Sequence, residues 1–206
     1  MVNQIVVINY GAGNIGSVLN MIKKAGGQAI ASSNISEIQS APKLLLPGVG
    51  SFDNAIDKLN NLGLVELITE RALSGTPLLG ICLGMQLLAN GSEEGTKAGL
   101  GLIPGKVKRF KFDEKNHLLR IPHMGWNRVT AVKQHPLADT LENDARFYFV
   151  HSYHYECENE GDALFKTHYG YDFTSGIQRD NIMGVQFHPE KSHRFGMQLL
   201  KNFIGL

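Results

Sequence analysis

The stretch PLLGICLGMQLL, Pro77 to Leu88, decides how the fold is read. Its apolar first half predicts a buried strand over residues 76–81, and the following CLGMQLLAN predicts a helix over residues 82–90. A strand that leads directly into a helix is typical of a sheet covered by helices. Cys82 lies at the junction of the two elements, and its presence there needs an explanation.

The first half of the chain repeats this alternation of strand and helix. Strands are predicted at residues 4–10, 28–32 and 43–50, and helices at residues 14–24 and 51–73, the second interrupted near residues 61–63. Because the strands are continuously apolar and separated by helices, we expect a parallel sheet covered on both faces.

The second half is richer in aromatic and β-branched residues, which favours further strands. We expect strands at residues 106–112, 126–132, 146–156 and 163–169, a hairpin over residues 175–187 turning at Asp180-Asn181, and a last helix over residues 193–204. The predicted fold class is therefore α/β, with a mixed, mostly parallel central sheet, helices on both faces and added antiparallel strands. No linker or repeat interrupts the sequence, so a single domain over residues 1–206 is expected.

Composition excludes several classes of protein. Lys plus Arg number 20 and Asp plus Glu 19, so we expect no general attraction to nucleic acid or to an anionic membrane. The two cysteines, Cys82 and Cys157, argue against a disulfide scaffold and for a reducing, cytoplasmic location. The N-terminal run lacks the basic region of a signal peptide, and no apolar run approaches the ~18 residues of a membrane span.

Cys82 has Gly80 and Gly84 two residues away on either side, which is the pattern of a nucleophile at a tight strand-to-helix turn. The start of a helix favours a thiolate over a thiol. The amide of Leu83 is placed to donate to an oxyanion that develops on a substrate carbonyl. The pattern therefore favours acyl transfer through sulfur. The alternative is a small, buried and inert cysteine.

A nucleophilic cysteine needs a base, and GVQFHPEK offers the best context for one. His188 follows an apolar strand, and Glu190 is close enough in sequence to accept a hydrogen bond from the imidazole and fix its orientation. The alternative is a solvated His-Pro-Glu loop.

Two further motifs are interpreted as structural. YGAGNIG has the G-x-G-x-x-G spacing of a dinucleotide-binding loop, but the acidic residue expected about 20 positions later is absent. HSYHYEC carries His151, His154 and Cys157. On one strand, residues three apart point to opposite faces, so we expect no metal site there.

The motifs PGVG, GICLGMQLL, PHMGWN, YFVHSY and GVQFHPEKS together resemble the class I, triad-type glutamine amidotransferases. More narrowly, the chain resembles the HisH family, the glutaminase subunits of imidazole glycerol phosphate synthase in histidine biosynthesis. The likeness extends from INYGAGN to the last helix. It implies a flavodoxin-like amidotransferase fold, L-glutamine as the substrate, and no metal or cofactor.

The resemblance also implies roles for individual residues. Cys82 matches the nucleophile that forms a thioester, His188 the general base and acid, and Glu190 the group that orients it. The PGVG motif matches the oxyanion strand, where the peptide at Val49 flips so that its N–H joins that of Leu83. The positions that match the binding site for the amino-acid end of glutamine are Gly50, Gln86, Glu94, Ser152 and Tyr153.

A partner is implied because the chain has no P-loop and shows no other phosphate-binding motif for an acceptor. In the family, ammonia passes to a cyclase of (β/α)₈ form in a heterodimer. The positions that match the interface or channel mouth are Asn14, Trp126, Tyr148 and Lys191. Three alternatives remain open at this point: a paralogous subunit that supplies ammonia for amidination of a surface-polysaccharide sugar, a nucleotide-binding module, and a stand-alone cysteine hydrolase.

Overall fold

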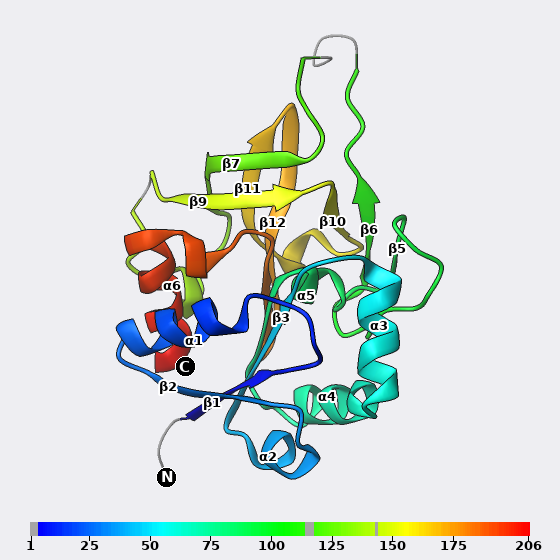
Figure 1. Cartoon of the computed structure of the whole chain (residues 1–206). Helices are drawn as coiled ribbons and strands as arrows, with labels where there is room; N and C mark the ends of the chain where they lie inside the picture. The colour runs from blue at the N-terminus through cyan, green and yellow to red at the C-terminus, as the bar shows by residue number, and fades with distance from the viewer. Residues whose placement is uncertain (1–3, 114–117, 143) are drawn as a thin grey trace.

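The computed structural model describes residues 4–113, 118–142 and 144–206. Within these residues the chain forms one eleven-stranded sheet and a separate two-stranded sheet (Figure 1). A parallel core of order β2-β1-β3-β4-β13 lies at the centre of the fold. Its strands are β1 (Gln4–Ile8), β2 (Gln28–Ser32), β3 (Lys43–Gly48), β4 (Leu78–Cys82) and β13 (Ile182–Val185).

Most of the remaining strands extend this core on one side. β12 pairs antiparallel with β13, and β10, β6 and β5 follow, while β11 and β8 branch from β12. Their bounds are β5 (Gly91–Ser92), β6 (Gly105–Arg109), β8 (Thr130–Ala131), β10 (Tyr153–Cys157), β11 (Ala163–Tyr169) and β12 (Tyr171–Arg179). The second sheet is the antiparallel pair β7 (His123–Arg128) and β9 (Arg146–His151).

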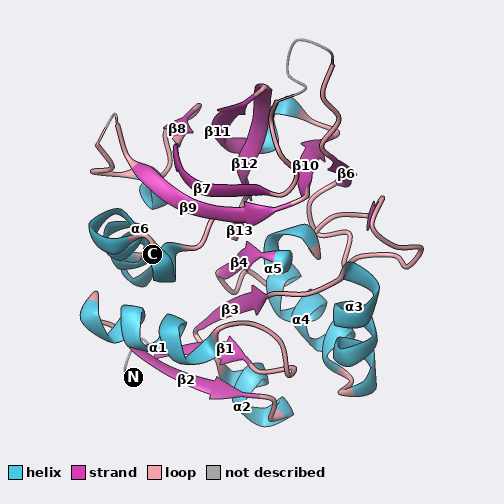
Figure 2. Cartoon of the chain, turned by 45° about the horizontal axis from the view of Figure 1, so that its top comes forward, coloured by secondary structure: helices cyan, strands magenta, loops and turns pink. Residues whose placement is uncertain are grey.

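Helices cover both faces of the parallel core, as Figure 2 shows. One face carries α1 (Ile15–Lys24) and α6 (His193–Gly205), and the other carries α2 (Ile35–Ser40), α3 (Phe52–Asn61) and α4 (Leu64–Leu73). Short 3₁₀ turns lie at Pro136–Ala138, Glu160–Asp162 and Pro189–Lys191. Of the helices described, none has the length and apolar character that crossing a bilayer requires.

The two apolar cores follow from the alternation of side chains along each strand. In β1, Ile5 and Val7 join the core beneath α1 and α6, whereas Val6 and Ile8 join the core beneath the other helices. All four side chains are at most 3 % exposed. This explains why β1 is apolar at four successive positions, Ile5 to Ile8.

The predicted fold class is confirmed. The strand order of the parallel core is that of flavodoxin-like folds, and the hairpin β12–β13 turns at Asp180 and Asn181 as expected. The predicted interruption of the long helical segment is also confirmed. Gly63, with φ of 65°, separates α3 from α4.

Three predicted elements are wrong in extent. The strand predicted over residues 126–132 is two strands, because β7 ends at Arg128 in the pair with β9, whereas β8 pairs with β11 in the large sheet. The helix predicted over residues 82–90 is only the four-residue α5 (Leu83–Gln86), because the chain then tightens into i→i−3 bonds and Asn90 donates its N–H to Gly105 instead. The single strand predicted over residues 146–156 is two strands, since the chain leaves the β7–β9 pair at Ser152 and enters the large sheet as β10.

One helix was not predicted. α2 begins after Asn34, whose side-chain oxygen accepts hydrogen bonds from the N–H groups of Ser36 (2.8 Å) and Glu37 (3.3 Å). Such a cap stabilises a short helix whose apolar periodicity is too brief to indicate it.

Gly84 brings α5 unusually close to β3. A Cβ atom at this position would lie 1.8 Å from the carbonyl oxygen of Leu46 and 2.8 Å from its carbon. No side chain fits there, so the backbone of the turn after Cys82 rests directly on the neighbouring strand.

We therefore expect Gly84→Ala to lower the free energy of unfolding by about 1–3 kcal/mol, the usual cost of overpacking a rigid site. Gly16→Ala is the matched control, because a Cβ at Gly16 in α1 meets nothing within 4 Å. The control should be neutral or stabilising by up to about 1 kcal/mol. Urea unfolding of both variants measures the difference, and equal stabilities would contradict the close approach.

Candidate active site

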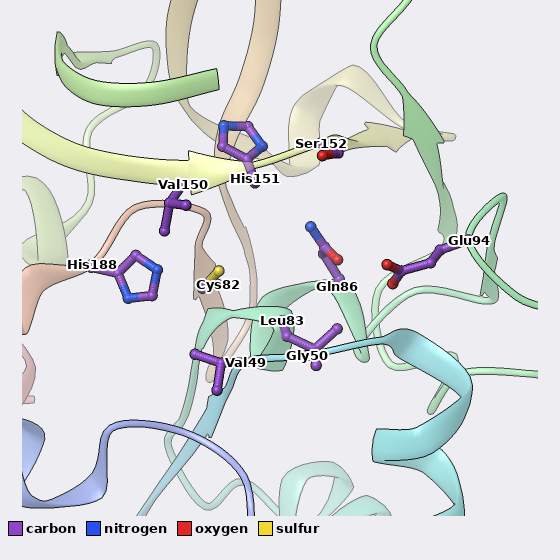
Figure 3. A pocket seen from close by; sticks show the side chains of 10 residues that line it. All are labelled: Val49, Gly50, Cys82, Leu83, Gln86, Glu94, Val150, His151, Ser152 and His188. Atoms are coloured by element: carbon purple, nitrogen blue, oxygen red, sulfur yellow. The ribbon is translucent and has the colours of Figure 1, made fainter. Parts of the chain in front are cut away.

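The candidate active site is built around a strained turn at the end of β4. Cys82 has φ of 55° and ψ of −111°, a conformation that costs a residue other than glycine roughly 1–3 kcal/mol. The close packing at Gly84 holds the turn in place. As a result Cys82 lines a cavity at the edge of the sheet where β4 ends (Figure 3), while the residue also packs in the core beneath α1 and α6. This is the nucleophile geometry that the sequence predicted.

His188 reaches the same cavity from the other end of the chain. β13 pairs with β4 in parallel, with Val185 opposite Ile81, so both strands end at the same edge of the sheet. The N–H of His188 donates to the carbonyl of Tyr148, 2.9 Å away, which holds the residue against β9. Cys82 and His188 both line the cavity.

Glu190 fixes the orientation of the His188 ring. Nδ1–H of His188 donates to Oε1 of Glu190 at 2.8 Å, and both side chains are 2 % exposed. Nε2 consequently faces Cys82, and it makes no regular hydrogen bond within the described part of the chain. This ring nitrogen is therefore available to exchange a proton with the sulfur or with a bound substrate.

The electrostatics of the pair favour a charged imidazole. Burial opposes the charged form of His188, but the sulfur of Cys82 and the carboxylate of Glu190 both favour it. Together these two groups raise the pKa of His188 to about 10. A charged imidazole beside a cysteine stabilises the thiolate, which is the nucleophilic form of sulfur.

The cavity has a volume of about 300 Å³. It is lined by Val49, Gly50, Cys82, Leu83, Gln86, Glu94, Val150, His151, Ser152 and His188 (Figure 3). The structure thus brings together every residue predicted for catalysis, the oxyanion site and substrate binding except two. Glu190 lies behind His188, and Tyr153 does not line the cavity.

Backbone amides gather on the floor of the cavity. Leu83 is the first residue of α5, and the first amides of a helix have no acceptor within the helix. Gly48, the last residue of β3, lies beside Cys82 in the parallel register, so Val49 and Gly50 continue past the sulfur. Gly50 has φ of 104°, which glycine adopts readily. These segments are placed to stabilise an oxyanion.

Polar groups gather at the other end of the cavity. Oε2 of Glu94 accepts a hydrogen bond of 2.8 Å from the N–H of Phe52 at the start of α3, which anchors this carboxylate. Nε2 of Gln86 donates to the carbonyl of Tyr153 at 3.2 Å. Tyr153 thus contributes its backbone to the site, and a role for its side chain stays a prediction. A carboxylate and amides suit the charged head of an amino acid.

The residues predicted for a partner interface lie outside the cavity. Trp126 pairs across the β7–β9 ladder with Tyr148, and their rings are 6.2 Å apart. Nζ of Lys191 lies 5.6 Å from the Tyr148 ring, and His193 stacks on Trp126 at 5.3 Å. We call Trp126, Tyr148, Lys191 and His193 the aromatic face. Asn14 is exposed and precedes α1.

Sequence reasoning missed two residues that line the cavity, Val150 and His151. His151 had been considered only as a metal ligand, under the assumption of one continuous strand. The exclusion of a metal site assumed that His151 and His154 lie on one continuous strand. This assumption is wrong, because the chain leaves β9 at Ser152. In residues 4–113, 118–142 and 144–206, no group of three or more His, Cys, Asp or Glu side chains is arranged to hold a metal. One feature of His151 could have indicated that it lines the cavity, namely its position at the end of a strand.

The glycine-rich loop after β1 is packed against the protein. A Cβ at Gly13 would lie 3.0 Å from the side chain of Pro47, and Nζ of Lys58 donates to the carbonyl of Gly11 at 2.9 Å. These contacts support the interpretation of this motif as a tight structural turn.

The raised pKa of His188 predicts a pH-dependent contribution to stability. The folded protein favours the charged ring, so His188 stabilises it fully below the ordinary pKa of 6.5, and this contribution is lost as the pH rises towards about 10. The stability advantage of the wild type over His188→Gln should therefore shrink over this range, by up to about 1.4 kcal/mol per pH unit. Urea unfolding at pH 6.5, 8.5 and 10 measures it.

His135→Gln is the control for this experiment. Burial lowers the pKa of His135, so its own pH dependence lies in the acidic range. Its stability difference from the wild type should be constant between pH 7 and 10. If the difference in stability between the wild type and His188→Gln is also constant between pH 7 and 10, the raised pKa of His188 is contradicted.

Comparison with known proteins agrees with this geometry. The family described as glutamine amidotransferase class-I matches residues 6–205. The chain is 51 % identical over 201 residues to the imidazole glycerol phosphate synthase subunit HisH 2 of Methanococcus maripaludis, covering 97 % of this chain and 98 % of that protein. It is 48 % identical to the subunit HisH 2 of Pseudomonas aeruginosa, covering 98 % and 99 % of the two chains.

Solved structures show the same fold at low sequence identity. PurLQS from Thermotoga maritima superposes with a TM-score of 0.73 at 15 % identity and covers 100 % of this chain and 99 % of that one. A structure described as a glutamine amidotransferase gives 0.71 at 18 % identity and covers 95 % and 98 %. The chain therefore belongs to the class-I glutamine amidotransferases, in their HisH branch.

Proposed function

We propose that this chain is the glutaminase subunit of imidazole glycerol phosphate synthase and that residues 1–206 act as one amidotransferase domain. The observation that carries the proposal is the cavity in which Cys82 and His188 meet, with Glu190 hydrogen-bonded behind the imidazole. The near full-length similarity to HisH subunits supports the choice of reaction.

The chemistry follows from the positions of the three side chains. Sγ of Cys82 attacks the amide carbon of glutamine, and His188 delivers its Nε2 proton to the departing nitrogen, so that a C–S bond replaces the C–N bond and ammonia leaves. Water then attacks the thioester while His188 takes up one of its protons. A C–O bond replaces the C–S bond, and glutamate is released. Glu190 keeps the ring in place through both steps.

The oxyanion of each tetrahedral intermediate needs two donors. The N–H of Leu83 supplies one, and the N–H of Val49 supplies the other after a rotation of the Gly48–Val49 peptide, for which Gly48 offers a permissive backbone. Losing one such donor typically costs about 10²–10³ in rate. The state of this peptide therefore gates hydrolysis.

The amino-acid end of glutamine binds at the opposite end of the cavity. Glu94 accepts hydrogen bonds from the substrate ammonium group, and Gln86, Gly50 and the Ser152–Tyr153 segment complete the binding site. The anchoring of Glu94 by the N–H of Phe52 supports this role. Binding of the amino-acid end of glutamine places the carbon of its side-chain amide near Sγ of Cys82, and this positioning lowers the activation barrier of the attack.

Ammonia released into neutral water is protonated and no longer nucleophilic, so the product must reach its acceptor inside a complex. The names of the HisH relatives identify them as subunits, which supports a partner for this chain as well. In the proposal the partner is a (β/α)₈ cyclase that binds over the aromatic face and Asn14 in a cytoplasmic heterodimer. No metal or cofactor takes part in the glutaminase steps.

Replacing the nucleophile tests the division of labour between the subunits. Cys82→Ser should fold normally and lower glutamine hydrolysis by at least about 10³-fold, because the hydroxyl is not ionised by His188. Synthesis of imidazole glycerol phosphate by the complex from added ammonium salt should continue. Both rates are measured on the purified complex with the candidate cyclase.

Cys157→Ser is the matched control, since Cys157 is half-buried at the end of β10 and outside the cavity. It should retain both activities. Loss of ammonia-driven synthesis in Cys82→Ser would contradict the proposed separation of sites. If glutamine hydrolysis is stimulated only by a different synthase, the proposed glutaminase activity stands but the proposed acceptor reaction is wrong. The acceptor would then be another molecule, such as a polysaccharide sugar that is amidinated.

The aromatic face predicts the binding site of the partner. Trp126 is 47 % exposed, and Met124, on the same side of β7, is 61 % exposed. Trp126→Ala should weaken binding of the cyclase at least about tenfold, because exposed tryptophans are frequent hot spots of interfaces. It should also reduce the stimulation of glutamine hydrolysis by the cyclase at sub-saturating concentration. Titration calorimetry measures the first effect.

Leu73→Ala serves as the control, since Leu73 is a 72 % exposed apolar residue at the end of α4. It should bind the cyclase as the wild type does. Equal affinities for Trp126→Ala and Leu73→Ala would place the interface elsewhere. High glutaminase activity of the isolated chain would contradict gating by the partner.

A further inference from the structure

Gln186 carries a polar side chain that is fully buried within the large sheet. It directly follows β13, and since Val185 lies opposite Ile81, Gln186 lies beside Cys82. Its backbone N–H donates to the carbonyl of Ser175 at 2.9 Å. A buried amide is costly unless both of its ends are hydrogen-bonded, so its partners show what it does there.

The side-chain amide of Gln186 connects two residues of the active site. Nε2 lies 3.7 Å from Sγ of Cys82, within the range of N–H···S hydrogen bonds. Oε1 accepts a hydrogen bond of 2.9 Å from Nε2 of Gln86. Gln186 does not line the cavity itself, so it reaches the sulfur from the protein side.

A backbone carbonyl determines which way this amide points. The amide of Gln86 contacts the carbonyl oxygen of Tyr153, which can only accept, so the contacting atom of Gln86 must be its nitrogen. The same nitrogen contacts Gln186, which must therefore present its oxygen. The remaining end of Gln186, the one that faces Cys82, is then the N–H₂ group.

The Tyr153 carbonyl is itself held by a buried histidine. Nδ1–H of His151 donates to it at 2.7 Å, and Nε2 of His151 accepts from Nδ1–H of His123 at 2.9 Å. Burial lowers the pKa of both histidines, so the rings are neutral and their tautomers follow from these partners. The anchor that orients Gln86 and Gln186 is therefore itself fixed.

We infer that Gln186 is a further catalytic residue of the proposed glutaminase, one that donates an N–H hydrogen bond to the sulfur of Cys82 and links that sulfur to the substrate-binding Gln86. The catalytic role of Gln186 rests on the proposed function, but the hydrogen bond from Gln186 to the sulfur does not. His188 faces the Cys82 sulfur from the cavity, whereas Gln186 approaches it from the protein interior. The imidazole exchanges the proton, and the amide stabilises the thiolate and fixes its direction.

Other titratable groups face the sulfur or the cavity around it. His188 lies beside the sulfur with Glu190 behind it, while Glu94 and His151 line the same cavity. Tyr10 lies beneath, and its hydroxyl donates to the carbonyl of Pro47 at 2.8 Å rather than to sulfur. Burial, and then the proximity of Cys82, raise the pKa of Tyr10, so it stays neutral. Of the two neutral donors Tyr10 and Gln186, it is therefore Gln186 that donates to the sulfur of Cys82.

Alkylation of Cys82 by iodoacetamide tests the inference without using glutamine. The reaction rate is followed from pH 5 to 10 on the full chain, by the mass of the peptide that carries Cys82. Gln186→Met keeps the length of the side chain and removes its donor. Because a hydrogen bond to an ionised group is lost, we expect the midpoint of the pH–rate profile to rise by about one pH unit and the rate at pH values well below both midpoints to fall about tenfold.

The plateau rate at high pH distinguishes this role from a structural one. A thiolate that has lost a donor is at least as nucleophilic as before, so the plateau of Gln186→Met should not fall. Ser175→Ala is the matched control. Its fully buried hydroxyl accepts from Thr167 at 2.8 Å in the same part of the sheet but does not contact sulfur. It should leave the midpoint unchanged.

An unchanged midpoint in Gln186→Met, or an equal shift in Ser175→Ala, would overturn the inference. If Gln186→Met does not fold, Gln86→Met decides, since it removes the group that orients Gln186: a raised midpoint supports the inference and an unchanged one overturns it. Absence of glutamine hydrolysis in the wild-type complex would contradict the proposed function alone, because the alkylation profile would still report the contact with sulfur.

Discussion

The site depends on the parallel pairing of β4 with β13. These strands are separated by about half of the sequence, yet their register sets Val185 opposite Ile81 and carries both chains to the same edge of the sheet. Cys82 is the last residue of one strand, and His188 follows shortly after the other. A shift of one residue in this register would turn every side chain of β13 to the opposite face. The apolar cores on both faces resist such a shift, so the packing of the sheet fixes the geometry of the reactive pair.

The same sheet supports a backbone turn that would be unfavourable alone. Cys82 holds a positive φ, and this strain persists because the turn is packed from both sides. Gly84 lies against Leu46 of β3, and the turn also approaches β4 so closely that a Cβ at Gly80 would lie 2.6 Å from the carbonyl oxygen of Gly84. The energetic cost of the turn is offset by the surrounding core, where β3, β4 and β13 are buried along their whole length. The strained turn brings Cys82 to the wall of the cavity.

Polar groups buried near the sulfur form connected networks rather than isolated contacts. The carbonyl of Tyr153 receives hydrogen bonds from His151 and from Gln86, and Gln86 in turn reaches Gln186. Each group has a defined donor or acceptor role because one backbone carbonyl begins the chain of partners. Such networks specify a single arrangement, since any rotated amide leaves a buried group unsatisfied. The position of the Cys82 sulfur and that of the Gln86 side chain, the proposed nucleophile and a proposed substrate-binding group, are therefore determined together.

The sequence by itself determined the class of fold, and it predicted Cys82, His188 and Glu190 as the reactive groups of the proposed function. Continuous apolar strands, the glycines around Cys82 and the His-Pro-Glu motif are local signals, and local signals suffice where one residue type satisfies one backbone constraint. Only the tertiary structure decided the extent of α5, the break of the strand at Ser152 and the role of Gln186. Each of these depends on hydrogen bonds to segments far away in sequence, such as Asn90 to Gly105, whose partners no local pattern can reveal because the folding of the whole sheet brings them together.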